Sequence, residues 1–299
     1  MGSNNKKLLA FPYYGGKFIH LDWLLPLLPK ANTFVDVFGG SGVVMINRDP
    51  SPVEIYNDLN GEIVNFFKQL RDHGEELISL LELTPVSRQE YNVAISDKAG
   101  EFSDIERARL FYLKIRQVRE TNLDRATETG WRYVVTQSRC GKSSNVSSWL
   151  NSLPKLKKVC DRLLQVQIEC DDALSILDRY DSEGTLFYCD PPYVHSTRVD
   201  RCCYVYEMEE EQHRRLLEKV CGVRGKVAVS GYDCDLYQEY LREEEGWVKY
   251  TRETKVCSGR GSKESKKKEK GNREEGKEES LKRVECLWCN YEDKQMMMF

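Results

Sequence analysis

The chain has 299 residues, of which 40% are apolar and 31% charged, and its formal net charge is −3. This length suffices for a catalytic domain that carries a smaller one, and the apolar share is too high for a disordered chain. No apolar run approaches the roughly 20 residues of a membrane-spanning helix, so we expect no contact with a membrane.

The eleven cysteines are interpreted as free thiols. Several stand in apolar, strand-like runs, where a thiol acts as a small hydrophobic side chain. No apolar run follows the charged start, so we expect no signal peptide and a cytoplasmic, reducing location. The C-x-x-C pair, Cys286 and Cys289, lies in a strand-like run that turns the two thiols to opposite faces, so we expect no metal.

The first third of the chain has the rhythm of an α/β protein. Thr33–Phe38 is a short β-branched and aromatic run that ends in glycines, and Val53–Tyr56 is a second such run. Leu59–Leu70 has apolar residues at helical spacing. A strand, a glycine turn, a helix, a strand and a helix in this order predict a parallel sheet.

The composition changes over residues 85–150. A helical pattern over Ile105–Val118 is followed by a polar stretch in which Trp131 and Tyr133 are interleaved. Residues 107–142 contain nine Lys or Arg residues against three acids. This texture predicts a basic subdomain that is inserted into the α/β domain.

The α/β rhythm then resumes. We predict helices over Leu153–Leu164, Glu207–Val220 and Leu236–Glu244, and strands over Val166–Cys170, Leu186–Cys189, Val227–Ser230, Trp247–Thr254 and Val284–Tyr291. Between the last two strands, Ser258–Arg283 has ten Lys or Arg residues, six Glu residues and no aromatic residue. It cannot bury enough apolar surface to offset the entropy of ordering, so it is predicted to be a flexible loop.

A glycine-rich turn follows the first predicted strand. Gly39, Gly40 and Gly42 would let the backbone approach a ligand at the carboxyl end of a parallel strand, although a tight structural turn also explains them. Asn57 and Asp58 end the second strand, where a carboxylate typically accepts hydrogen bonds from a ribose. Either residue would also suit as the cap of the next helix. The preceding glycine turn favours the ribose.

The strongest motif is Asp190-Pro191-Pro192-Tyr193, directly after an apolar strand. Two consecutive prolines hold the backbone extended and remove two amide donors. The result is a rigid edge that offers only acceptors, beside the Asp190 carboxylate and the Tyr193 ring. Such an edge suits an amino group that flanks an aromatic ring.

These motifs, in this order, resemble those of the Dam-type DNA adenine methyltransferases. Phe11–Lys17 is similar to the N-terminal cofactor motif of that family, and Phe38–Gly42 is similar to its F-x-G-x-G turn. Asp58 stands where the family has a ribose-binding carboxylate, and Asp190–Tyr193 resembles its catalytic motif. The chain departs from the family at Tyr13, where a Trp is usual, and in the charged loop, which is expanded.

The resemblance implies a Rossmann-like, mostly parallel, seven-stranded methyltransferase sheet with an inserted small, mainly helical DNA-recognition subdomain. Residues 1–84 would form the cofactor-binding half of the catalytic domain, residues 85–150 the inserted subdomain, and residues 151–299 the catalytic half, with the charged loop 258–283. The implied activity is site-specific transfer of a methyl group from S-adenosylmethionine to the exocyclic 6-amino group of adenine, by base flipping and direct in-line transfer.

The resemblance also assigns site residues. It implies that S-adenosylmethionine is bound by Tyr13, Lys17, Asp36, Phe38, Gly39, Gly40, Ser41, Gly42, Asp58, Asp171 and Asp190. For Asp171, a helix cap is an equally good interpretation. The implied catalytic residues are Asp190, Pro191, Pro192 and Tyr193. Tyr193 would stack on the flipped adenine, while Asp190 and the Pro191 carbonyl accept hydrogen bonds from its amino group.

The basic insertion is the predicted surface for double-stranded DNA, with Arg116, Arg119, Arg132, Arg139 and Lys142 as candidate contacts. The ordinary alternative for each residue is a solvated helix face. We expect a monomer, and the resemblance leaves open whether a restriction endonuclease is paired with it. Alternative activities are methylation of RNA adenine or of the cytosine amino group, and a catalytically inactive DNA-binding relative.

Overall fold

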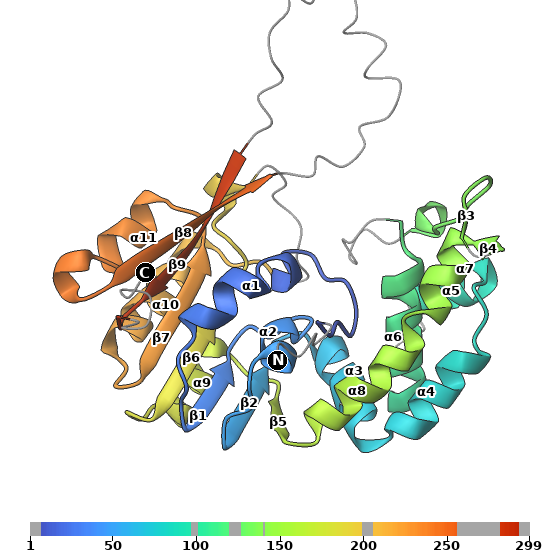
Figure 1. Cartoon of the computed structure of the whole chain (residues 1–299), viewed down its shortest axis with the longest axis horizontal. Coiled ribbons are helices and arrows are strands. Elements are labelled where there is room, and N and C mark those ends of the chain that lie inside the picture. Colours follow the sequence, from blue (N-terminus) through green and yellow to red (C-terminus); the bar gives the residue numbers. More distant parts are fainter. Residues whose placement is uncertain are drawn as a thin grey trace, which may run out of the picture.

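The computed structural model describes residues 7–96, 101–119, 127–139, 141–198, 206–255 and 282–292. Its centre is a seven-stranded sheet with the strand order β5-β2-β1-β6-β7-β9-β8 (Figure 1). The neighbours from β5 to β7 pair in parallel, and β9 runs antiparallel to β7 and β8. The bounds are β1 (Thr33–Asp36), β2 (Val53–Asn57), β5 (Val166–Glu169), β6 (Thr185–Cys189), β7 (Lys226–Gly231), β8 (Val248–Lys255) and β9 (Lys282–Cys289). The predicted mostly parallel, seven-stranded α/β sheet is confirmed.

The strand order reverses beside β1. After β1 the chain builds outward through β2 and β5, and it then returns to place β6 on the other side of β1. The carboxyl ends of β1 and β6 therefore flank a crevice, which is where ligands bind in open sheets of this kind. The glycine turn follows β1 and the Asp190 motif follows β6, so the topology brings the two motifs together.

Side chains of the central strands alternate between two apolar cores, one on each face of the sheet. Phe34 and Tyr188 belong to one core, and their sequence neighbours Val35 and Phe187 belong to the other. Burial on both faces explains why these strands are continuous apolar runs. The first core includes residues of α1 (Leu21–Leu24), α2 (Val43–Asn47) and α3 (Gly61–Asp72), and the second those of α9 (Ala173–Tyr180), α10 (Glu210–Gly222) and α11 (Asp235–Tyr240).

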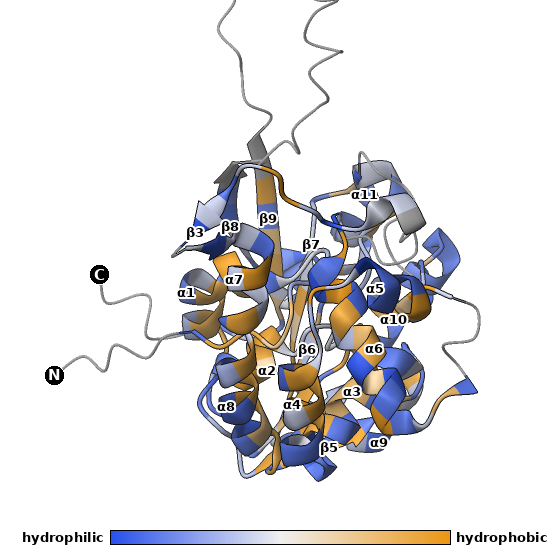
Figure 2. Cartoon of the chain, turned by 90° about the vertical axis from the view of Figure 1, so that its right-hand side faces the viewer, coloured by the Kyte–Doolittle hydropathy of each residue, from blue (hydrophilic) through white to orange (hydrophobic). Residues whose placement is uncertain are grey.

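A helical lobe packs around α3 at one side of the sheet (Figure 1). Phe66 of α3 stacks on Tyr112 of α6 with the ring centroids 5.5 Å apart, and Phe11 meets Phe66 and Phe111 edge-on. Figure 2 shows hydrophobic residues gathered along α3, α4 and α6. The lobe consists of α4 (Gly74–Leu83), α5 (Arg88–Ala94), α6 (Asp104–Gln117), α7 (Ser144–Leu150), α8 (Leu153–Leu163) and a hairpin of β3 (Ser138–Arg139) and β4 (Lys142–Ser143). The domain boundaries at residues 84 and 150 stay predictions.

Two helices begin later than the sequence predicted, because of their caps. α3 begins at Gly61, since the Asn60 side chain accepts a hydrogen bond from the Glu62 amide. Asn57 and Asp58 are therefore not its cap. α10 begins after a capping box that Glu209 and Gln212 form, and this leaves residues 206–208 in the loop that leads to it.

Two element ends near the C-terminus also differ from the prediction. α11 stops at Tyr240, and the rest of the predicted helix leads into a short 3₁₀ turn that ends at Gly246 in the left-handed conformation. β9 begins at Lys282, two residues inside the segment predicted as a flexible loop. Most of that segment, residues 258–281, lies outside the described residues. Among the residues that the structure describes, no helix is long and apolar enough to cross a membrane.

A buried ion pair ties β2 to α8. The Arg162 guanidinium donates to both carboxylate oxygens of Glu54, at 2.6 and 2.7 Å, and also to the Met45 carbonyl at 3.0 Å. The Glu54 side chain is fully buried and that of Arg162 is 12% exposed. A charge that is buried this deeply needs an oppositely charged partner. The pair therefore helps to fix the position of α8 on the sheet.

Replacement of Glu54 with Leu should lower the free energy of unfolding by about 3–5 kcal/mol, because the Arg162 charge stays buried without its partner. The double variant Glu54→Leu/Arg162→Leu should recover most of that loss, since no buried charge remains. Urea unfolding followed by circular dichroism measures both, with Glu76→Gln on the exposed face of α4 as the control. A double variant no more stable than Glu54→Leu would contradict this account.

Candidate active site

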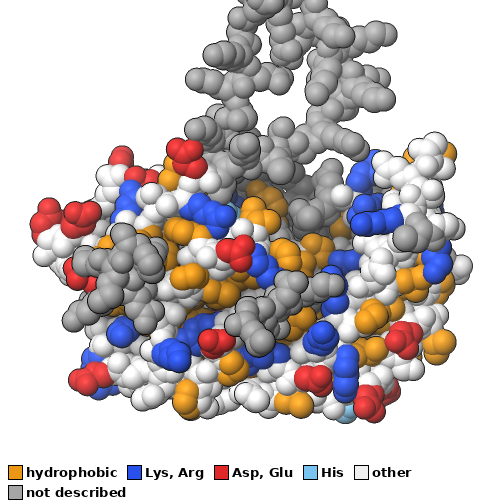
Figure 3. Space-filling view, viewed as in Figure 1, with side chains coloured by type: hydrophobic (Ala, Val, Ile, Leu, Met, Phe, Trp, Pro, Cys, Tyr) orange, Lys and Arg blue, Asp and Glu red, His pale blue; other side chains and the backbone are white. Residues whose placement is uncertain are grey.

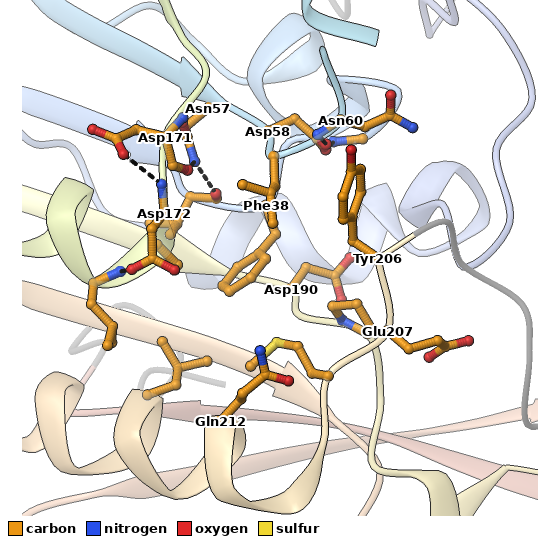
Figure 4. A pocket seen from close by; sticks show the side chains of 18 of the residues that line it. Phe38, Asn57, Asp58, Asn60, Asp171, Asp172, Asp190, Tyr206, Glu207 and Gln212 are labelled. Carbon is orange, nitrogen blue, oxygen red and sulfur yellow. Dashed lines mark hydrogen bonds between the residues drawn. The ribbon is translucent and has the colours of Figure 1, made fainter. Parts of the chain in front are cut away.

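A cavity opens at the carboxyl ends of β1, β2, β5 and β6. About 990 Å³ of space that no atom fills lies within it, counting the open solvent at its mouth. Figure 4 shows the Phe38 ring between the side chains of Asp171 and Tyr206. The lining includes Tyr13, Phe38, Gly40, Asp58, Asp171, Asp190, Tyr206, Glu207 and Gln212. A smaller cavity shares Tyr13, Phe38, Gly40 and Asp190 with it and continues to Lys17, Asp36, Gly39 and Ser41.

The glycine turn has the shape that its residues require. A Cβ at Gly39 would lie 2.1 Å from the Tyr56 ring, and Gly40 has a φ of +50°, so side chains are disfavoured at both positions. The Tyr56 hydroxyl donates to the Gly40 carbonyl at 2.7 Å and holds the turn against β2. Gly42, also predicted to bind the cofactor, faces inward, where a Cβ would contact Ile46 and Phe67.

Asp58 both braces the turn and lines the cavity. Its carboxylate accepts hydrogen bonds from the Gly40 amide at 2.8 Å and from the Asn60 amide at 2.7 Å. Burial raises its pKa to about 6, although the two amides act in the opposite direction. Each oxygen has a further lone pair, so the carboxylate can still accept from a ligand hydroxyl while it holds the turn.

Asn57 joins the ends of three strands. Its amide donates to the Val37 carbonyl and to the Asp171 carbonyl, each at 3.0 Å, and its oxygen accepts from the Asp171 amide at 2.9 Å. The Asp171 carboxylate lies toward α9, where Arg179 donates to it at 2.7 Å. The cap of α9 is the neighbouring Asp172, so the capping alternative for Asp171 is wrong.

The Asp36 carboxyl is buried and lines the smaller cavity. Burial raises its pKa to about 8, with the nearby carboxylates of Asp190 and Asp58 adding to the effect. The Met45 amide, which lies in α2, lowers this pKa by a hydrogen bond. At neutral pH the group is therefore mostly protonated, and it can donate a hydrogen bond as well as accept one.

A buried lysine holds the Asp190 motif. Lys17 Nζ lies 2.6 Å from Asp190 Oδ1, 3.4 Å from Glu285 Oε1 and 4.9 Å from the centre of the Tyr193 ring. The Tyr193 hydroxyl donates to Glu285, and its ring packs edge-on against Tyr232 with the centroids 4.7 Å apart. Side chains from both ends of the sequence thus meet at the carboxyl end of β6.

The charges of this group perturb one another. Burial raises the pKa of Asp190 to about 6, even though the Lys17 ammonium lowers it, and Glu285 raises it further. Burial alone would lower the pKa of Lys17, but the two carboxylates outweigh it and the pKa is raised. At neutral pH a lysine cation therefore lies between two carboxylates, one of which, Asp190, reaches the cavity.

Sequence reasoning missed Glu285. Its side chain is 5% exposed and belongs to β9, far along the chain from the motifs that revealed the site. The signal was present: Glu285 is the one charged residue in the run Val-Glu-Cys-Leu-Trp-Cys over residues 284–289, which the burial of both strand faces makes costly. No local pattern, however, identifies its partners.

The five basic residues predicted to meet DNA are not equivalent. Arg119, Arg132, Arg139 and Lys142 are exposed, and the last two pair across the β3–β4 hairpin. Arg116 is half-buried and donates to the carbonyl and the hydroxyl of Ser148, at 2.9 and 3.1 Å. Figure 3 shows Lys and Arg side chains near the tip of this lobe, and Asp and Glu side chains gathered at the opposite end, near α11.

Arginines and aromatic rings alternate on the surface of the same lobe. The Arg88 guanidinium lies 4.7 Å from the centre of the Trp131 ring, and that of Arg119 lies 5.6 Å from the centre of the Tyr133 ring. The two rings are inclined by only 20° to each other. Trp131 is anchored through Nε1 to Gln117, whereas Tyr133 is 52% exposed. Planar groups of this kind suit stacking on nucleic-acid bases.

The family model of D12 class N6 adenine-specific DNA methyltransferases matches residues 13–256. The chain is 24% identical over 189 residues to the DNA N-6-adenine-methyltransferase of Escherichia phage P1, covering 61% of this chain and 24% of that protein. It is 34% identical over 101 residues to the Type II methyltransferase M1.LlaDCHI of Lactococcus lactis subsp. cremoris, covering 31% of this chain and 34% of that protein. It is 44% identical over 69 residues to the Modification methylase StsI of Streptococcus sanguinis, covering 22% and 10%. The chain thus spans about a third or less of each relative.

The buried Asp36 carboxyl should make stability depend on pH. Between about pH 4 and pH 8 the folded chain keeps a proton on Asp36 that the unfolded chain has released, so stability falls as pH rises through this window. Asp36→Asn should therefore gain on the parent by up to about 1.4 kcal/mol per pH unit, and the gain should level off above about pH 8. Urea unfolding from pH 5 to pH 9 measures this difference. A difference that does not change with pH would show that Asp36 is ionised in the folded chain.

Proposed function

The chain belongs to the D12 class N6 adenine-specific DNA methyltransferases, whose model matches residues 13–256, and we propose that it transfers a methyl group from S-adenosylmethionine to the exocyclic 6-amino group of adenine in double-stranded DNA. One observation carries this proposal: the Asp190 carboxylate, held by Lys17, lines the cavity at the point where the strand order reverses. An acceptor placed there, beside an edge without amide donors, suits an amino group.

The cavity has the donors and acceptors that S-adenosylmethionine needs. Asp58 has lone pairs left for the hydroxyls of a ribose, and Gly40, which lines the cavity without a side chain, allows a close approach. Phe38 and Leu174 supply apolar surface for a purine. Several carboxylates line the same space, among them Asp58, Asp190 and Glu207, and their negative charge suits a ligand with a sulfonium and an ammonium group.

Asp190 acts on the nitrogen that receives the methyl group. The lone pair of the adenine amino group is delocalised into the ring, which makes it a poor nucleophile. A carboxylate that accepts a hydrogen bond from the amino group draws its protons away from the ring plane and returns the lone pair to nitrogen. When bound, S-adenosylmethionine supplies a sulfonium methyl that is already activated, so positioning provides most of the remaining rate.

The target adenine must leave the duplex to reach Asp190. Base-modifying enzymes rotate the target nucleotide into a pocket and hold it by stacking. The Tyr193 ring is fixed by its hydroxyl on Glu285 and by Tyr232 behind it, so little ordering remains to be done when a base arrives. In this proposal the ring stacks on the adenine.

The helical lobe supplies the DNA contacts. Its exposed basic residues Arg119, Arg132, Arg139 and Lys142 suit phosphates, and the Arg88, Trp131, Tyr133 and Arg119 stack suits unpaired or exposed bases. The Arg116 guanidinium already donates a hydrogen bond to Ser148 of α7. We therefore expect it to hold α7 in place and not to contact phosphate. Transfer of labelled methyl to duplex DNA, to RNA of the same sequence and to DNA without adenine separates this activity from the RNA and cytosine alternatives.

Asp190→Ala should lower the single-turnover rate of methyl transfer at saturating cofactor by about 10²–10³-fold, because the amino group loses its acceptor. Asp58→Asn should instead raise the cofactor concentration that half-saturates the reaction more than it lowers the saturated rate. Labelled methyl in duplex DNA measures both, and Asp178→Asn on the exposed face of α9 serves as the control. A near-parental rate for Asp190→Ala would remove the main support for the proposed function.

Changing Arg119, Arg132, Arg139 and Lys142 together to Gln should weaken DNA binding and make it less sensitive to salt, by about 0.9 in the log–log slope for each phosphate that the protein no longer neutralises. Arg116→Gln should leave the slope unchanged. A matched variant with the exposed residues Lys30, Arg224, Lys226 and Arg242 changed to Gln removes the same charge outside the helical lobe. Fluorescence anisotropy over a range of salt concentrations measures the slopes. Equal decreases of affinity in the two four-residue variants would place the DNA surface elsewhere.

A further inference from the structure

The Glu285 side chain contacts two residues of the site, Tyr193 and Lys17. Its carboxylate accepts a hydrogen bond from the Tyr193 hydroxyl and lies 3.4 Å from the Lys17 ammonium, which in turn lies 2.6 Å from Asp190. The side chains of Lys17 and Glu285 are each 5% exposed, and that of Asp190 is 16% exposed. One cation is therefore shared by two carboxylates, and the outer one faces the cavity.

The other titratable groups around this arrangement are nearly all neutral at physiological pH. Burial raises the pKa of Asp36, of the tyrosine hydroxyls and of the thiols, and it lowers that of His20. Arg252 is a cation and lies opposite Glu285 in the β8–β9 register, and Lys249 acts on the neighbouring Cys286. These neighbours are Asp36 of β1, Tyr188 and Cys189 of β6, Tyr193, Tyr237 of α11, Cys286 of β9, Arg252 of β8 and His20.

We propose that Glu285 is a positioning residue for the reaction: from β9 it draws part of the Lys17 charge away from Asp190 and anchors the Tyr193 hydroxyl, which keeps Asp190 a strong acceptor and the ring in place. This rests on the proposed function. A lysine paired with Asp190 alone would neutralise it more completely and weaken its hold on an amino proton. Without any lysine, the buried carboxyl would take up a proton and lose its acceptor strength.

The charge of Glu285, and not only its shape, is therefore required. A glutamine in its place fills the same space and can still accept from the Tyr193 hydroxyl. It cannot compete for the ammonium, so Lys17 would pair with Asp190 alone. A purely structural role predicts the reverse: any residue that fills the site and accepts one hydrogen bond would serve equally well.

The first test needs no activity. The parent, Glu285→Gln and Glu285→Asp are labelled with ¹³C at the aspartate carboxyls, and the Asp190 signal is assigned with Asp190→Asn. In Glu285→Gln its titration midpoint should move down by about one pH unit, because a like charge is removed and Lys17 is no longer shared. Glu285→Asp keeps the charge and should stay close to the parent. Asp233→Asn removes a carboxylate whose partner is Lys249 and is the matched control.

The second test follows methyl transfer. The acid limb of the rate against pH should shift down with the Asp190 midpoint in Glu285→Gln, while the plateau rate falls at least about tenfold. Tyr193→Phe keeps the ring but removes the hydroxyl that anchors it on Glu285 and that also lowers the pKa of Asp190 by a hydrogen bond. It should therefore raise KM for duplex DNA about fivefold and change kcat less when both are measured on the pH plateau. This variant tests the anchoring part even if the Glu285 variants fail to fold.

The outcomes separate this inference from the proposed function. If the parent methylates DNA but the Asp190 midpoint does not move in Glu285→Gln, or moves equally in Asp233→Asn, the inference is overturned and the methyltransferase proposal stands. A parental KM for DNA in Tyr193→Phe overturns the anchoring part. If the parent transfers no methyl group to DNA, the proposed function fails, whereas the titration still shows whether Glu285 controls Asp190.

Discussion

The site depends on the Lys17 ammonium, which is buried between the carboxylates of Asp190 and Glu285. Lys17 follows the N-terminal glycines, Asp190 ends β6 and Glu285 lies in β9, so one cation joins three distant parts of the chain. Burying these charges is costly unless the geometry is good. The arrangement therefore persists only when the N-terminal segment, the strand end and the antiparallel strand are all in place, and a complete sheet becomes a condition for an ionised Asp190.

The side of the crevice formed by β1, β2 and β5 is organised by side-chain hydrogen bonds to backbone groups. Asn57 joins the ends of β1, β2 and β5, and Asp58 accepts from the Gly40 amide across the gap between β1 and β2. The placement of both residues at the crevice follows from the parallel sheet, because its strands all end at one edge. The two halves of the site thus differ. In one half, Asn57 and Asp58 hold the backbone in place by hydrogen bonds, and in the other half Lys17 forms ion pairs with two carboxylates.

The sequence was sufficient for the sheet and for the residues that follow its strands. Apolar runs that end in Gly39 or Asp190 carry a local pattern, and parallel topology then dictates that their ends meet. The partners of Glu285 and Arg88 were out of reach, since they lie far away in sequence and no local pattern identifies them. The surroundings of Arg116 were out of reach for a related reason: its positive charge shows in the sequence, but its hydrogen bonds to Ser148 do not.

Side-chain packing sets the position of the helical lobe relative to Asp190. Asn60, two residues after Asp58, caps α3, and Phe66 of α3 stacks on Tyr112 of α6. α6 in turn leads to Gln117, which accepts from the Trp131 indole. A continuous series of close contacts therefore runs from the cofactor side of the crevice to the stacked rings of the lobe. Because packed interiors resist deformation, these contacts hold the stacked rings at a fixed distance from Asp190. Under the proposed function, a duplex seated on those rings would then need little movement besides the rotation of one base.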